Sequence, residues 1–181
     1  MLSITVPAAE FFDDEAQEFI TFDEVTLNLE HSLVSLSRWE SKWEKPFLGP
    51  TEKTTPETFG YIESMNLEGE IPPEVFLRIS NEILEKINEY ITSKMSATWF
   101  TELPKKGGPI EIITSELIYY WMFTLNVPLE CEHWHLNRLF TLIKVFNEKN
   151  QPEKKKMSAA ELAARNRELN AKRRAEMATS G

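Results

Sequence analysis

The chain has 181 residues, with 20 Lys and Arg against 29 Asp and Glu, so its formal net charge is −9. This length fits one domain, or one domain with a tail, and a hydrophobic fraction of 41% argues against wholesale disorder. A single cysteine excludes an internal disulfide framework and a zinc site built from several cysteines. The longest apolar stretch, residues 117–123, is far shorter than the roughly 20 residues that cross a bilayer. Because no Lys or Arg precedes Arg38, we expect neither a secretory signal nor a transit peptide.

Charge is distributed unevenly along the chain. Residues 1–151 hold 12 Lys and Arg against 25 Asp and Glu, a net charge of −13, whereas residues 152–181 hold 8 against 4, a net charge of +4. Pro152 and the lysine run at residues 154–156 interrupt a long apolar pattern, and proline ends a helix. We therefore predict an acidic, mostly helical body over residues 1–151 and a basic, partly helical tail over residues 152–181. Such a tail either folds back onto the body or reaches a separate partner.

The amino-terminal residues, about 1–29, have the pattern of β-strands. Residues 2–6 alternate apolar and polar side chains, which is typical of a half-buried strand. Residues 18–29 continue in that style as one or two further short strands, after a polar turn at residues 13–15. We predict a small β-hairpin or a three-stranded sheet, which is stable only if it packs on another element.

Helical periodicity replaces this alternation after residue 29. Large apolar side chains recur at spacings of four, three, three and four and so share one helical face: Leu29, Leu33, Leu36, Trp39 and Trp43. Thr55–Pro56–Glu57 and Pro72–Pro73–Glu74 are helix-start signals, and a further apolar face extends from Ile83 to Ile91. We therefore predict a helix in each of these places, the first of them ending at Pro46.

The carboxyl-terminal half continues the helical pattern. We predict a loop at residues 105–109, a helix buried nearly all round at residues 117–125, and a further helix at residues 130–147. In the tail, the capping-box spacing of Ser158–Glu161 predicts a helix over residues 159–177 for at least part of the time. The expected fold class is mainly α, a helical domain with a small amino-terminal β-hairpin or sheet and a basic carboxyl-terminal helix.

One cluster, Cys131–His135, combines residue types that bind metals. A zinc site needs three or four convergent ligands and supporting outer contacts, and His31, the remaining histidine, lies far along the chain. On a helix, Cys131 and His135 could share a face while His133 would point elsewhere, whereas on a strand all three would face one side. We therefore predict no metal site, with Trp134 and its apolar neighbours anchoring a helix and the histidines at the edge of that helix.

Signatures of catalysis and of nucleic-acid recognition are missing from the sequence. It has no Gly-x-Ser-x-Gly elbow and no phosphate-cradling glycine-rich loop, so we predict that the protein is not an enzyme and uses no cofactor. Arg165, Arg167, Arg173 and Arg174 of the tail could contact phosphate, but the acidic body repels it. We expect these arginines to dock on an acidic protein or on the acidic amino end; a solvated charge run without a partner is the alternative.

Aromatic residues are numerous, with five Trp, eleven Phe and four Tyr. Aromatic side chains are favoured at interaction surfaces, where they supply contact area at a low cost in entropy. The candidate partner-binding anchors are Trp39, Trp43 and Phe47 on one predicted helix, and Trp99 and Phe100 before a loop. The alternative, equally open at this point, is that these residues fill the core.

Three stretches of sequence carry a family resemblance. They are residues 29–47 (LEHSLVSLSRWESKWEKPF), residues 116–139 from ELIYYWM to WHLNRL, and residues 165–171 (RNRELNA). Together they resemble the tail assembly chaperones encoded in the tail-gene modules of long-tailed bacteriophages, and the resemblance covers most of the chain.

The resemblance implies a non-enzymatic role in the cytoplasm of the host cell. Such chaperones bind the long helical tape-measure protein, shield its apolar stripes from aggregation, and release it as subunits of the tail tube protein polymerise around it. A helical partner with exposed aromatic side chains could cover those stripes by helix-in-groove packing. Self-association of the chain is left open, and neither a membrane nor a nucleic acid is an expected partner. The alternative is a virion structural protein, a tail, connector or capsid-associated component acting by protein–protein contacts.

Overall fold

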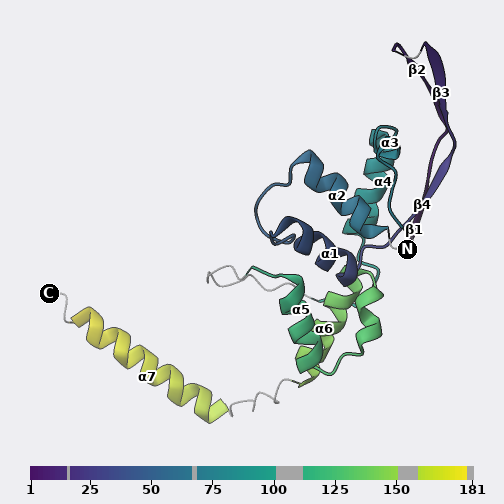
Figure 1. Ribbon diagram of the computed structural model, residues 1–181. Helices are drawn as coiled ribbons and strands as arrows, with labels where there is room; N and C mark the ends of the chain where they lie inside the picture. The colour runs from purple at the N-terminus through teal and green to yellow at the C-terminus, as the bar shows by residue number, and fades with distance from the viewer. Residues whose placement is uncertain (16, 67–68, 101–111, 151–158, 179–181) are drawn as a thin grey trace. The chain divides into compact units, whose positions relative to one another are not determined.

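The computed structural model describes residues 1–15, 17–66, 69–100, 112–150 and 159–178, in two units, Met1–Asn147 and Glu148–Gly181. The predicted mainly α fold with a small amino-terminal β element is confirmed (Figure 1). The strands are β1 (Leu2–Val6), β2 (Ala9–Asp13), β3 (Glu18–Phe22) and β4 (Val25–Leu29). The helices are α1 (Leu33–Trp43), α2 (Thr55–Met65), α3 (Pro73–Phe76), α4 (Asn81–Thr92), α5 (Ser115–Thr124), the 3₁₀ helix η1 (Leu129–His133), α6 (Leu136–Asn150) and α7 (Ala159–Ala178). No helix among the described residues is long and apolar enough to cross a membrane.

The four strands are successive parts of one antiparallel hairpin. β1 pairs with β4, where Leu2 lies opposite Leu29, and β2 pairs with β3, where Ala9 lies opposite Phe22. The residue numbers of each pair add to the same total in both ladders, so the register continues across the break between them. Pro7 lies at this break, and proline cannot donate a ladder hydrogen bond. We call β1–β4 the proximal hairpin and residues 9–22 the distal hairpin.

Of the two predicted alternatives, the structure has the β-hairpin and not the three-stranded sheet. The expectation of one or two strands in residues 18–29 is met by β3 and β4, but β2 is a strand that the sequence analysis did not predict. The sequence of β2, AEFFD, has two adjacent phenylalanines instead of an alternation, so periodicity gave no signal.

Arg78 holds the two strands together at the break. Its Nη1 donates hydrogen bonds to the carbonyl oxygens of Pro7 at 2.8 Å and Asp23 at 2.9 Å. Its guanidinium carbon lies 5.4 Å from the centre of the Phe22 ring, within the range of a cation–π contact. Arg78 therefore links the base of the distal hairpin to the segment that follows α3.

Two hydrophobic cores share helix α1. The first core joins the proximal hairpin to α1, α2 and α4 through buried residues that include Ile4, Leu27, Trp39, Met65 and Ile87. The second core joins α1 to α5, η1 and α6 through Leu33, Leu36, Ile118, Met122 and Leu139, among others. The buried carboxylate of Glu40 adds polar ties, because it accepts backbone hydrogen bonds from Phe47 and Ser115, both at 2.7 Å.

Two helix predictions for the carboxyl-terminal half are wrong in detail. Helix α5 is not buried nearly all round, because Tyr120 is 62% exposed and Phe123 is 64% exposed. The helix predicted at residues 130–147 is broken between η1 and α6, where the Nδ1 atom of His135 accepts the backbone N–H of Asn137 at 3.3 Å and caps α6. The predicted loop at residues 105–109 and the cap residue Ser158 lie outside the described residues.

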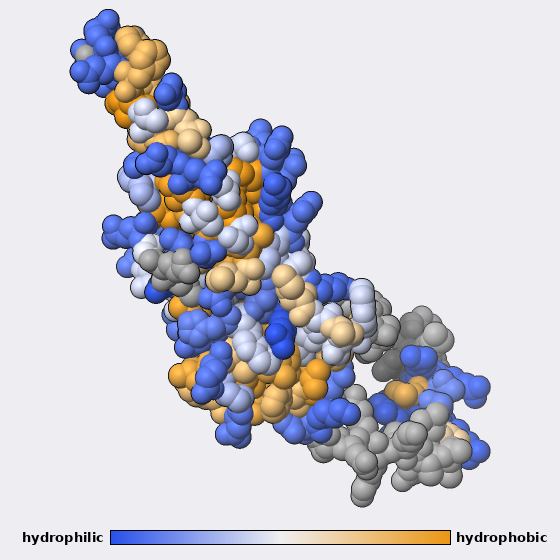
Figure 2. All heavy atoms as spheres, turned by 90° about the vertical axis from the view of Figure 1, so that its right-hand side faces the viewer, coloured by the Kyte–Doolittle hydropathy of each residue, from blue (hydrophilic) through white to orange (hydrophobic). Residues whose placement is uncertain are grey.

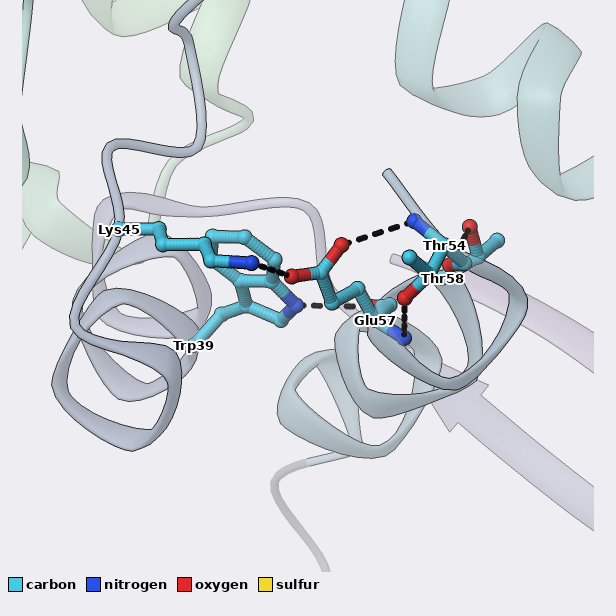
Figure 3. A network of polar contacts seen from close by, with 5 residues as sticks. All are labelled: Trp39, Lys45, Thr54, Glu57 and Thr58. Carbon is cyan, nitrogen blue, oxygen red and sulfur yellow. Dashed lines mark hydrogen bonds and ion pairs between the residues drawn. The ribbon is translucent and has the colours of Figure 1, made fainter. Parts of the chain in front are cut away.

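Helix α2 begins with a capping box that also contacts α1 (Figure 3). The cap is Thr54, one residue before the predicted position, and its backbone N–H donates to Glu57 Oε2 at 2.8 Å. The other carboxylate oxygen of Glu57 accepts a hydrogen bond from Lys45, and its backbone carbonyl accepts one from Trp39 Nε1 at 2.7 Å. These hydrogen bonds, first from Lys45 and then from Thr54, lower the pKa of Glu57 from 4.5 to about 2.

This pKa predicts how stability responds to acid. A carboxyl group with a lowered folded-state pKa stabilises the protein above its unfolded-state pKa of 4.5, and the contribution is lost as the pH falls toward 2. Glu57→Gln keeps an acceptor for Thr54 but removes the charge that pairs with Lys45. We expect this variant to have a lower free energy of unfolding at about pH 7, and the deficit to shrink as the pH falls from 4.5 to 2.

Urea unfolding of the wild-type protein and of Glu57→Gln across this pH range tests the prediction. Glu52→Gln, a change of the same kind at an exposed position, is the matched control and is expected to leave stability unchanged. A deficit in Glu57→Gln that stays constant with pH would contradict the assignment.

Candidate partner-binding surface

The distal hairpin carries large apolar side chains that no core covers. Phe11 is 48% exposed, Phe12 47%, Phe19 70% and Ile20 43%. Phe11 lies opposite Ile20, and Phe12 lies opposite Phe19. Because adjacent residues of a strand point to opposite faces, these two pairs expose apolar surface on both faces of the hairpin. Figure 2 shows hydrophobic side chains among hydrophilic ones there, at the top of the view.

Ring contacts across the strands hold the distal hairpin together. The ring centres of Phe12 and Phe19 lie 5.1 Å apart. Those of Phe11 and Phe22 lie 5.8 Å apart in a T-shaped arrangement, in which the edge of one ring points toward the face of the other ring. Within the described part of the chain, β2 and β3 pair with each other alone, so each has one free edge. An isolated two-stranded hairpin is marginally stable in water, and free edges invite pairing with another chain.

Acidic residues surround this apolar surface. Residues 7–24 contain seven Asp and Glu and no Lys or Arg: Glu10, Asp13, Asp14, Glu15, Glu18, Asp23 and Glu24. Asp13 lies directly opposite Glu18 at the end of the ladder, next to the turn. The distal hairpin therefore combines exposed aromatic side chains with negative charge.

The three anchors predicted on α1 and after it belong to the first core. Trp39 is 1% exposed, so its side chain is not accessible to a partner, and its prediction as an anchor is wrong. Trp43 is partly buried and packs on α2, where a Cβ atom added to Gly60 would lie 2.8 Å from its Nε1. Phe47 stacks on Tyr61 with ring centres 3.9 Å apart. The alternative stated for these residues, that they fill the core, is correct for Trp39 and describes the packing of the other two.

The second predicted pair lies at the surface. Trp99 is 74% exposed, and the Nζ atom of Lys94 lies 3.7 Å from the centre of one of its rings. Phe100 is partly buried, with Lys144 Nζ 5.8 Å from its ring centre. Both aromatic residues line a groove of about 560 Å³ together with Leu48, Ile113 and Phe140, among others. Trp99 therefore remains a candidate contact residue.

The tail arginines belong to the second unit. Arg165, Arg167, Arg173 and Arg174 lie on α7, and all four are exposed. Their side chains are therefore accessible within that helix.

The local structure places the side chains of Cys131, His133 and His135 in three different environments. Cys131 is buried in the second core, and burial raises the pKa of its thiol, whereas the His133 side chain is 52% exposed. Both ring nitrogens of His135 are engaged, because Nε2 donates to the carbonyl oxygen of Tyr90 at 2.9 Å and Nδ1 caps α6. Across the described ranges, no group of three or more His, Cys, Asp or Glu side chains could hold a metal ion.

A buried cluster of His31, Tyr61, Tyr90 and His135 lies where the two cores meet. His31 Nδ1 lies 2.5 Å from the Tyr61 hydroxyl, and its ring centre lies 4.9 Å from that of His135. The backbone carbonyl of His31 accepts the N–H of Leu136 at 2.8 Å. Sequence reasoning missed this cluster because its members come from four distant segments and share no spacing. Burial first, and then the proximity of His135, lowers the pKa of His31 from 6.5 to about 3.

The His31 pKa predicts a loss of stability below neutral pH. His31 is neutral in the folded protein, but the unfolded chain binds a proton below pH 6.5, so the free energy of unfolding falls as the pH drops from 6.5 toward 3. The slope contributed by one such histidine is about 1 kcal/mol per pH unit. His31→Asn retains a polar partner for Tyr61 but cannot titrate, so we expect a lower stability at about pH 7 and a shallower slope between about pH 6.5 and 5.

Urea unfolding in steps across that interval, which lies above the range in which Glu57 titrates, measures this slope. His133→Asn, at the exposed histidine, should keep the wild-type slope. An unchanged slope in His31→Asn would show that other groups carry the pH dependence.

Comparison with known proteins adds no relative. No family model matches the chain, and neither a curated protein nor a solved structure is significantly similar to it.

Proposed function

We propose that the protein is a tail assembly chaperone that binds the tape-measure protein of a long-tailed phage and keeps it soluble while the tail tube assembles. The sequence resemblance suggests this role, and one structural observation supports it. The distal hairpin exposes Phe11, Phe12, Phe19 and Ile20 to solvent on an acidic, folded body. Exposed apolar patches on a folded protein mark interaction surfaces.

The proposed role requires reversible contact with an apolar client. Burying one large apolar side chain stabilises a complex by about 2 kcal/mol, so a few such side chains give a contact of modest strength. Several copies along one tape-measure protein would bind in combination, yet each could be displaced in turn by subunits of the tail tube protein. This role takes place in the host cell cytoplasm and needs no catalytic residue and no cofactor.

Further exposed side chains supply secondary contact surfaces. Trp99 lies beside its groove, and Tyr120 and Phe123 are exposed on α5. The arginines of α7 are exposed, and their positive charge would attract an acidic partner. The hairpin remains the strongest candidate because its four apolar side chains are adjacent.

The free edges of β2 and β3 favour a second function, that of a virion structural protein. In that case the same hairpin would be buried permanently against a neighbouring subunit of the particle. The two functions differ in where the protein is found, because a chaperone leaves before the tail is complete.

Co-expression with the tape-measure protein of the same genome tests the proposal. We expect the tape-measure protein to become soluble and to co-elute with several copies of this chain in size-exclusion chromatography with light scattering. The double variant Phe12→Ser/Phe19→Ser should lower the soluble fraction at least several-fold, because it removes two adjacent exposed rings.

Leu129→Ser is the matched control, since Leu129 is 49% exposed and lies outside the hairpin, in η1. A tape-measure protein that precipitates in the presence of the wild-type chain would overturn the chaperone function. Stoichiometric recovery of the chain from purified particles by mass spectrometry would instead support the structural function.

A further inference from the structure

We propose that the distal hairpin is a docking surface for a basic amphipathic segment, one with large apolar side chains on one face and Lys or Arg beside them. This inference rests on the proposed function for the identity of the partner, and it adds the class of segment that the hairpin recognises. It combines two independent properties of residues 7–24, the exposed apolar side chains and the sign of the charge around them.

The apolar part of the surface is already organised. The Phe12 and Phe19 rings contact each other on one face of the hairpin, and Phe11 and Ile20 lie opposite each other on the other face. Rings held in place lose little conformational freedom when a partner covers them. Each face therefore offers a preformed platform for apolar side chains.

The charge of the surface selects the partner. Seven acidic residues and no basic residue occur in residues 7–24, so every charged side chain that the hairpin presents to a segment covering the rings is negative. Like charges opposite each other across two strands are destabilising, and Asp13 lies opposite Glu18. A cationic segment relieves this repulsion, whereas an acidic segment or a nucleic acid adds to it.

The positive charge of Arg78 lies at the base of the distal hairpin and not at its tip. Arg78 contacts Phe22 and the carbonyl oxygens of Pro7 and Asp23, which places its charge at the junction with the proximal hairpin. The ring pairs and the turn lie further along the strands, beyond this contact. The tip therefore offers both the apolar surface and the negative charge to the same partner.

Labelled peptides of about 20 residues test the inference with the full-length chain, by fluorescence anisotropy. The first peptide is an amphipathic helix of Leu and Lys, the second has Glu in place of each Lys, and the third has Ser in place of each Leu. We expect binding of the first peptide alone. Its affinity should fall about tenfold between about 50 and 500 mM NaCl, because salt screens exposed charges.

Two sets of variants separate the two properties. Phe12→Ser/Phe19→Ser should weaken binding of the Leu–Lys peptide about tenfold. The triple change Glu10→Gln/Asp13→Asn/Glu18→Gln should weaken it about fivefold and flatten its salt dependence. The matched control neutralises the three exposed acids of α4, Glu82, Glu85 and Glu89, and should leave binding unchanged. Circular dichroism and the melting temperature check that each variant is folded.

Three results would overturn the inference. They are equal binding of the Leu–Glu peptide, an equal loss of affinity in the α4 control, and self-association of the chain that the Phe12/Phe19 double change abolishes, which would make a second copy the occupant.

Co-expression with the tape-measure protein separates this inference from the proposed function. If the hairpin charge variant solubilises the tape-measure protein as well as wild type does, the chaperone function stands and the charge selection is wrong. If wild type fails there but binds the Leu–Lys peptide as described, the chaperone function is wrong and the docking surface stands.

Discussion

The fold of the first unit depends on the buried carboxylate of Glu40. Its two oxygens accept the backbone N–H groups of Phe47 and of Ser115, a residue 75 positions away, at the start of α5. Burying a carboxylate is costly unless it is hydrogen-bonded, and removing it would leave two backbone donors without this acceptor. Helix α1 contributes Trp39 to the first core and Leu33 to the second. The Glu40 carboxylate therefore ties the helix that both cores share to Phe47 and to the start of α5.

The hairpin shows how one continuous register serves two purposes. In the proximal part, Ile4 and Leu27 are buried against the helices, whereas in the distal part the phenylalanines remain exposed. Arg78 lies where these two parts meet and donates hydrogen bonds to the carbonyl oxygens of Pro7 and Asp23, next to the break in the ladder. Exposed apolar side chains raise the risk of aggregation. Their presence beside a well-packed core is what a binding surface would require.

The polar groups of the interior contact one another and the backbone where the two cores meet. His31 and His135 contact each other and Tyr61 and Tyr90, with both ring nitrogens of His135 hydrogen-bonded to the backbone. Desolvation holds the pKa of both histidines below the usual value, so this histidine pair stays uncharged near neutral pH. Residues 7–24, by contrast, carry seven acidic residues and no Lys or Arg.

Local signals in the sequence were sufficient to predict the mainly α class, the alternating strands β1 and β4, and the start of α2 to within one residue. These features could be predicted because helix caps and periodicity depend on a few neighbouring residues. The same signals could not tell Trp39 from Trp99, since a periodic face shows that a residue is apolar but not which segment covers it. They also predicted α5 as buried all round, whereas Phe123 is exposed because the second core covers one side of that helix. The exposure of Phe19 and the meeting of His31 with His135 were decided by the tertiary structure alone, because burial depends on contacts between segments far apart in the chain.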